Sequence, residues 1–310
     1  MKKIFLVLSA VVMTAISVSA QDLATATETF NNGAMELQMG NMEAALTNFQ
    51  SALEMAEALG EQGAEIATNC KGAIPQVMFS IAKGLIKDEN YEGALAQLEA
   101  TIAAANKYES ADVAAEAAEF IPQVYMQQGN TALKAKDMAT AVAAYTKVIE
   151  LEPANGNAML RLGQVYAATG KVDEAVAAFE QAAANGQEKT ANKQLSTLFL
   201  KKAQAAVKAK KFQEAVDFAA KSNSYVESAN AYRMAASAYQ QLNNTAECIA
   251  SYEKYLELNP NAKDATGVKY TIAALAQTAG NKEKAKEYYQ MILTDPQYGA
   301  TAKQMLEQLK

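Results

Sequence analysis

Histidine and tryptophan are absent from this sequence of 310 residues, and only two arginines and two cysteines occur in it. Histidine is the most frequent general base and metal ligand in proteins, so its absence excludes Ser–His and Cys–His nucleophile pairs from this chain. A zinc site would need clustered cysteines and carboxylates, and the sequence contains no such cluster. The composition therefore argues against an enzyme and predicts no cofactor, no metal and no catalytic residue.

Basic residues are outnumbered by acidic ones, with 28 Lys and Arg against 34 Asp and Glu and a net charge of −6. Nucleic acids and anionic membranes bind through clustered basic side chains, so neither is an expected partner. The nearest basic cluster is predicted to be a solvated helix face, with a binding patch as the alternative. It consists of Lys201, Lys202, Lys208, Lys210 and Lys211. No later segment provides the roughly 20 apolar residues of an integral membrane span.

The first twenty residues have the pattern of a secretory signal peptide. Lys2 and Lys3 precede an apolar stretch over residues 4–16, and small residues at 18–20 stand before Gln21. No cysteine follows the expected cleavage point, so a lipid anchor is not predicted. We expect an exported protein, periplasmic or secreted in a Gram-negative bacterium.

A small residue recurs along the rest of the chain at spacings of 49, 47, 34, 40, 33 and 37 residues. These residues are Ala45, Ala94, Ala141, Ala175, Ala215, Cys248 and Ala285. Another small residue stands twelve positions before each: Gly33, Ala82, Gly129, Gly163, Ala203, Ala236 and Ala273. A mostly large apolar residue stands four positions after each: Phe49, Leu98, Tyr145, Phe179, Ala219, Tyr252 and Tyr289. Periods of about 20 to 50 residues are typical of stacked repeats that cannot bury an apolar face alone.

Within a unit, apolar residues recur at helical steps of three and four, as at Met42, Ala45, Leu46 and Phe49. Sustained strand-like alternation is missing, and good helix formers dominate, so the predicted fold is all-α. Small residues let two antiparallel helices approach closely. The large residue one turn later is expected to fill the space between neighbouring units.

Each unit is expected to turn between its two helices at a pair of residues that tolerates a left-handed backbone. The strongest pairs are Gly40-Asn41, Glu89-Asn90, Gly170-Lys171, Asn243-Asn244 and Gly280-Asn281; weaker versions are Lys136-Asp137 and Lys210-Lys211. Long first helices kinked at proline are expected around Pro75 and Pro122. Residues 295–310 are predicted to form a closing helix over the last unit.

The two cysteines could form a disulfide in an exported protein, but the repeat pattern argues against it. Cys70 lies between the first two units and Cys248 in the sixth, so we do not expect the separation of about 7 Å that a disulfide needs. Cys248 is predicted to be a packed thiol.

A row of carboxylates on one helix face could act in general acid–base catalysis or bind Ca²⁺, but a solvated helix face is the favoured interpretation. Its members are Glu109, Asp112, Glu116 and Glu119.

The pattern resembles the tetratricopeptide repeat family. The best single match runs over Leu162, Gly163, Tyr166, Gly170, Ala175, Phe179 and Ala182. The family's first-helix tryptophan is replaced by Met78, Tyr125, Met159, Phe199 and Tyr232. The resemblance implies a right-handed α-solenoid of about seven helical hairpins with a C-terminal capping helix. Residues 21–310 would form one domain, with elongated repeats over 21–120 and more regular ones over 121–310.

In this family the first helix of each unit lines the concave surface, so the resemblance implies a row of groove residues. The row is Phe30, Phe79, Met126, Leu160, Leu200, Arg233 and Tyr270, accompanied by Lys83, Asn130, Arg161 and Gln164. An exposed row would bind a peptide or a helical segment. The alternative is that these side chains pack between adjacent first helices. The two arginines would bind a ligand carboxylate or pair with a neighbouring Asp or Glu.

Three functions remain open on this basis. The first is a non-catalytic scaffold for protein–protein interaction, with a protein or peptide partner in the groove. The second is a structural envelope protein that associates with itself. The third, capture of a glycan or nutrient, would be expected to use an anchoring cysteine or tryptophan platforms that the sequence lacks. The oligomeric state is left open.

Overall fold

The computed structural model describes residues 18–309. Most of the expected signal segment, residues 1–17, lies outside the described residues. The chain divides into two compact units, one ending at Pro153 and the other beginning at Ala154.

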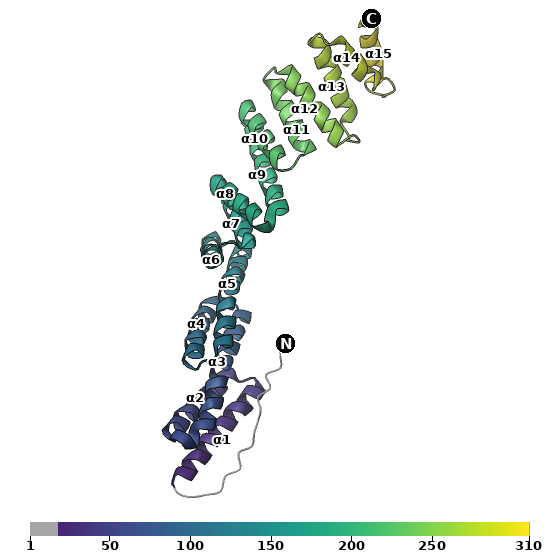
Figure 1. Ribbon diagram of the computed structural model, residues 1–310. Helices are drawn as coiled ribbons and strands as arrows, with labels where there is room; N and C mark the ends of the chain where they lie inside the picture. The colour runs from purple at the N-terminus through teal and green to yellow at the C-terminus, as the bar shows by residue number, and fades with distance from the viewer. Residues whose placement is uncertain (1–17, 310) are drawn as a thin grey trace. The chain divides into compact units, whose positions relative to one another are not determined.

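The first unit consists of three helical hairpins that follow one another in chain order (Figure 1). Its elements are α1 (Val18–Met39), α2 (Met42–Ala58), the short helix η1 (Gly60–Gly63), α3 (Ala64–Lys87), α4 (Tyr91–Lys107), α5 (Ala111–Lys134) and α6 (Met138–Leu151).

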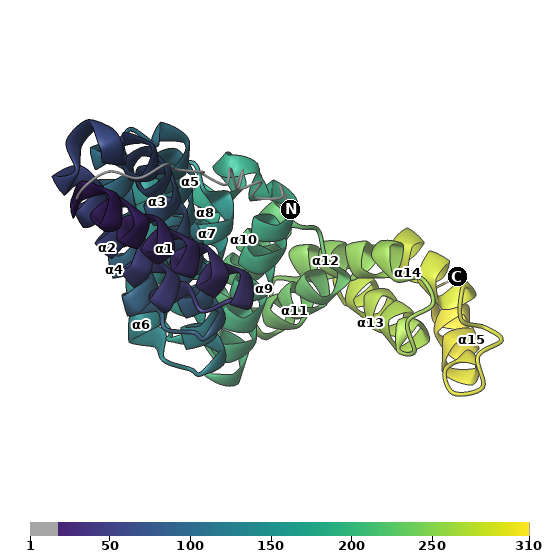
Figure 2. The ribbon, with the colours of Figure 1, turned by 90° about the horizontal axis from the view of Figure 1, so that it is seen from below.

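The second unit contains four hairpins and a closing helix, whose neighbouring helices lie side by side in Figures 1 and 2. Its elements are α7 (Gly156–Ala168), α8 (Val172–Ala182), the short segment η2 (Ala183–Gln187), α9 (Glu188–Lys208), α10 (Phe212–Tyr225), α11 (Ala229–Gln241), α12 (Thr245–Leu258), α13 (Ala265–Thr278), α14 (Lys282–Gln290) and α15 (Gly299–Gln308). The described residues therefore confirm the all-α fold and its seven hairpins.

The turn inside each hairpin has the left-handed backbone that the sequence predicted, including the two weaker positions. The first residue of all seven turns has a φ between 57° and 86°. These residues are Gly40, Glu89, Lys136, Gly170, Lys210, Asn243 and Gly280. The next residue is the N-cap of the following helix, and in four of the seven turns its side chain accepts a backbone hydrogen bond, as Asn90 does from Gly93 at 3.1 Å. Helix ends are thus determined by local chemistry.

The small residues of both recurring positions are buried in all seven hairpins. At Gly33, Gly129 and Gly163 an added Cβ would lie 2.7–3.0 Å from an aromatic ring carbon of the same hairpin. The rings belong to Phe49, Tyr145 and Phe179. Each ring therefore covers the glycine of its own first helix, and Phe49 also belongs to a buried cluster that includes Ile66 and Ile74 of α3, in the next hairpin.

Two expectations are corrected by the helix boundaries, and one feature was not anticipated. Glu109 lies in a turn with a φ of 58° before α5 begins, so the row of carboxylates loses its first member. The closing helix begins at Gly299 rather than at residue 295, after a series of turns that follows α14. An extra long first helix, α9, was not expected; it follows a kink in which Asn185 and Gly186 leave helical geometry.

Helices α3 and α5 continue through Pro75 and Pro122 for 24 residues each. Long first helices at these positions were predicted, and the structure confirms them.

Both cysteines are buried with free thiols. Burial raises the pKa of the Cys70 thiol to about 12 and that of the Cys248 thiol to about 11. Because the thiolate is the reactive form, these two groups are chemically inert packing residues at neutral pH. Cys248 fills its small position, as predicted.

Candidate functional site

The predicted groove residues of the first unit lie at equivalent places on α1, α3 and α5, but burial separates them. Phe79 is only 4% exposed and meets the ring of Phe120 edge-on, with 5.0 Å between ring centroids. Phe30 is half-buried against the ring of Phe49 at 5.3 Å, and Met126 is also half-buried. The packing interpretation is therefore confirmed for Phe79, which offers a partner almost no surface.

The two polar residues of this row are already engaged within the protein. The ammonium group of Lys83 lies 3.6 Å from the centroid of the Phe79 ring and 3.5 Å from a carboxylate oxygen of Glu116. The amide oxygen of Asn130 accepts a hydrogen bond from the hydroxyl of Tyr145 at 2.9 Å. In the first unit the predicted residues mainly stabilise the stack of hairpins.

The apolar members of the row in the second unit are also partly packed away. Leu160 is 8% exposed. Leu200 is half-buried in the cluster between α9, α10 and α11. Tyr270 stacks on Tyr298 at 5.1 Å and meets Tyr289 at 6.1 Å. The packing interpretation holds for Leu160, while Leu200 and Tyr270 keep part of their surface.

The guanidinium groups of the two arginines have different interaction partners. The guanidinium of Arg233 lies 2.8 Å from a carboxylate oxygen of Asp264, so the local ion pair is confirmed there. Arg161 is exposed and donates a hydrogen bond at 3.2 Å to the amide oxygen of Gln164, on the next turn of its own helix. Lys83, Arg161 and Arg233 are all exposed, and Arg161 is the one whose charged group has an amide oxygen rather than a carboxylate as its partner. Whether the row binds a partner stays a prediction.

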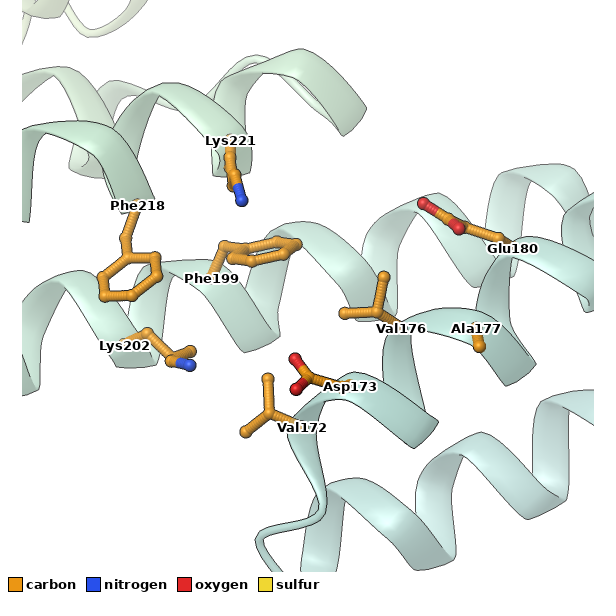
Figure 3. A pocket seen from close by; sticks show the side chains of 9 residues that line it. All are labelled: Val172, Asp173, Val176, Ala177, Glu180, Phe199, Lys202, Phe218 and Lys221. Carbon is orange, nitrogen blue, oxygen red and sulfur yellow. The ribbon is translucent and has the colours of Figure 1, made fainter. Parts of the chain in front are cut away.

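A pocket of about 330 Å³ lies elsewhere in the second unit, between α8 and α10 and over α9. Figure 3 shows its side chains, and α8 contributes one wall while α9 and α10 contribute the other. The lining residues are Val172, Asp173, Val176, Ala177, Glu180, Phe199, Lys202, Phe218 and Lys221.

Aromatic rings form the apolar part of this pocket. Phe199 stands where the family has its tryptophan, and its ring lies parallel to that of Tyr225, with 5.9 Å between centroids and 3° between planes. The Phe199 ring also stacks on that of Phe218, with 6.3 Å between centroids. Lysine ammonium groups lie near these rings, that of Lys202 at 4.8 Å from Phe218 and that of Lys221 at 5.5 Å from Phe199. Cations over aromatic faces are attracted by the ring electrons.

The opposite wall of the pocket carries the carboxylates of Asp173 and Glu180. The hydroxyl of Tyr225 donates a hydrogen bond to Glu180 at 2.8 Å. Burial, with this carboxylate as a second cause, raises the pKa of Tyr225 to about 12, so the hydroxyl stays protonated at neutral pH. The pocket therefore has an apolar base between a basic and an acidic wall.

The sequence alone could not show that these residues line one pocket, because they come from three helices spread over residues 172–221. One signal was present. Lys202 belongs to the basic cluster noted above, although a solvated face was the favoured interpretation for it.

Reactive chemistry is not evident elsewhere in the described part of the chain. Over residues 18–309, no group of three or more Cys, Asp and Glu side chains is placed to hold a metal ion. Within the same range, no helix combines the length and apolar character that crossing a bilayer requires.

The arrangement of hairpins defines the class of the protein as an all-α helical repeat. Family models described as tetratricopeptide repeat match residues 126–189 and 229–262. The chain therefore contains tetratricopeptide repeats, and proteins built from such repeats are generally non-catalytic scaffolds for interaction with proteins or peptides.

The solved structures that match this chain share little of its sequence. A crystal structure of MamA protein is 20% identical, covers 59% of this chain and 96% of its own, and gives a TM-score of 0.36. YrrB, described as a TPR protein with an unusual peptide-binding site, is 21% identical over 58% of this chain and 91% of its own, with a TM-score of 0.31. PilF of Pseudomonas aeruginosa is 17% identical over 62% and 93%, with a TM-score of 0.29. No curated protein matches the sequence.

Proposed function

We propose that this protein is an exported, non-catalytic scaffold that binds a peptide or a helical segment of a partner protein along the first helices of its second unit. The observation that carries the proposal is the open guanidinium of Arg161 beside partly exposed polar and apolar positions on the following first helices. Gln204 on α9 and Ser237 on α11 are exposed at the places equivalent to Gln164. Such a set supplies hydrogen bonds and a carboxylate ligand without any reactive group.

Site-specific photo-crosslinking tests the proposed surface. A benzoylphenylalanine residue at Arg161 or Gln204, both exposed, should form adducts with a discrete partner when the protein is expressed in its native host. The same residue at Glu214 or Glu247, exposed positions on the second helices α10 and α12, should form far fewer adducts with that partner. Equal adduct yields at all four positions would remove the first-helix surface from the proposal.

Export is proposed on the sequence pattern of residues 1–20 and has its own test. The first buried side chain among the described residues is Leu23, so cleavage before Gln21 would remove none of the described core. N-terminal sequencing of the protein from a periplasmic fraction or the culture medium should therefore begin at Gln21. A chain that keeps its first twenty residues and stays in the cytoplasm would contradict the proposal.

Self-association is the alternative function, and the exposed methionines of the first hairpin favour it. Met35 and Met39 are 53% and 58% exposed, one turn apart on α1. Light scattering distinguishes the two, since a monomer at working concentration would exclude a structural role through self-assembly.

A further inference from the structure

We propose that the pocket between α8 and α10 is a second docking site, which takes a peptide segment carrying a large apolar side chain next to a carboxylate. This site lies between the second helices α8 and α10, with Phe199 and Lys202 of α9 at its base, whereas the scaffold function proposed above uses Arg161 and Gln204, which do not line the pocket. The two proposals can therefore fail separately.

The charge of the surrounding hairpin selects an acidic partner. Residues 188–225, which form α9 and α10, contain eight lysines and only three acidic residues. The whole chain has a net charge of −6, so this hairpin is a basic region in an acidic protein. A basic region attracts an acidic segment and raises its rate of association.

The size and apolar base of the pocket suit a side chain rather than a large cofactor. Its volume of about 330 Å³ is near the lower end of the roughly 300–1,000 Å³ that is usual for ligand pockets. Phe218 is partly exposed beside the nearly buried Phe199, and Val172 and Val176 face them from α8 (Figure 3). An aromatic or large aliphatic side chain inserted here would bury its own surface against these groups.

The two lysines of the pocket are positioned to receive the carboxylate. The ammonium groups of Lys202 and Lys221 lie over aromatic rings, at 4.8 Å and 5.5 Å from the centroids. A ring satisfies an ammonium group less completely than a carboxylate does, so an entering anion would gain a charge-assisted hydrogen bond from one lysine and long-range attraction from the other.

The acidic wall determines how such a segment lies. Asp173 and Glu180 repel a carboxylate on the α8 side, and Glu180 is already bonded to the hydroxyl of Tyr225. The carboxylate of the segment must therefore face α9 and α10. This orientation makes opposite predictions for the two walls: loss of a lysine weakens binding, and loss of Asp173 strengthens it.

The probe is a short fluorescein-labelled peptide with one phenylalanine between glutamates, and binding to the full-length mature protein is followed by fluorescence anisotropy. Two matched peptides replace either the phenylalanine with alanine or the glutamates with glutamine. The parent peptide should bind, and each matched peptide should bind about tenfold more weakly, because one loses the apolar contact and the other the ion pairs.

Adjacent residues of the same charge provide matched control variants. Lys202→Gln should weaken binding of the parent peptide about tenfold, whereas Lys201→Gln, which removes an exposed lysine outside the pocket, should change it less than about twofold. Asp173→Asn should strengthen binding about threefold, and Glu174→Gln, in the same first turn of α8 but outside the pocket, should leave it unchanged.

The outcomes separate the pocket from general attraction by the basic hairpin. Equal effects of Lys201→Gln and Lys202→Gln, or of Asp173→Asn and Glu174→Gln, would show that only overall charge matters and would overturn the proposal. The proposal also fails if wild-type protein does not bind the parent peptide, or binds the alanine peptide equally well. Because Asp173→Asn is expected to increase affinity, its effect cannot result from misfolding.

Discussion

Phe179→Ala is expected to lower the free energy of unfolding of the second unit by about 3–5 kcal/mol. The Phe179 side chain is 1% exposed and closes the α7–α8 hairpin against Gly163. Its removal leaves a cavity between two helices whose backbones are held in place by their neighbours, so the site cannot collapse fully. Urea unfolding followed by circular dichroism measures the change. Leu258→Ala, at a residue 40% exposed, is the control and should cost less than about 1 kcal/mol.

A double-mutant cycle tests the reason for this effect. In the wild-type protein Gly163→Ala places a Cβ 2.7 Å from the Phe179 ring, so the ring must shift and stability should fall by about 1–3 kcal/mol. In the Phe179→Ala background the same substitution meets no ring and should cost little. Additive effects of the two changes would show that the glycine and the ring do not act as a pair.

Gly63→Ala should lower the free energy of unfolding of the first unit by about 3 kcal/mol. Gly63 is buried where α3 begins, and an added Cβ would lie 2.1 Å from the backbone carbonyl oxygen of Ala56 in α2. A backbone atom cannot rotate away as a side chain can, so one of the two helices must move.

Gly72→Ala is the matched control for this prediction. Gly72 is exposed inside the same helix, α3, and no neighbouring atom lies within 4 Å of an added Cβ. Alanine is the better helix former, so this change should raise stability by up to about 1 kcal/mol. Thermal unfolding of the two variants should therefore shift in opposite directions. A downward shift of the same size in both would contradict the explanation.

Local features were predicted well because they depend on neighbouring residues in the chain. The seven left-handed turn positions follow from Gly, Asn or a weaker substitute at the end of a first helix, and even Lys136 and Lys210 were placed correctly. The recurring small residues were also identified, since only short side chains allow antiparallel helices to cross closely. Glu109 was misplaced because it has the same left-handed backbone without a typical turn residue.

Exposure of the groove residues was not predictable in the same way. Phe79 and Arg161 stand at or beside the same register of a first helix, yet one is buried and the other open. Periodicity indicates which face of a helix a residue occupies, but not how much of it the next hairpin covers. Coverage depends on helix length and on the side chains of neighbours far along the chain, such as Phe120 over Phe79.

The sequence by itself determined the all-α repeat, the number of hairpins and the places where they turn, because helix propensity, capping and small-residue spacing act over a few neighbouring residues. Only the tertiary structure decided that the rings of Phe49, Tyr145 and Phe179 cover the glycines of their own hairpins, and that Phe199, Lys202, Lys221 and Asp173 line one pocket. Those contacts join residues that lie tens of positions apart, and the packing of whole helices against one another brings them together.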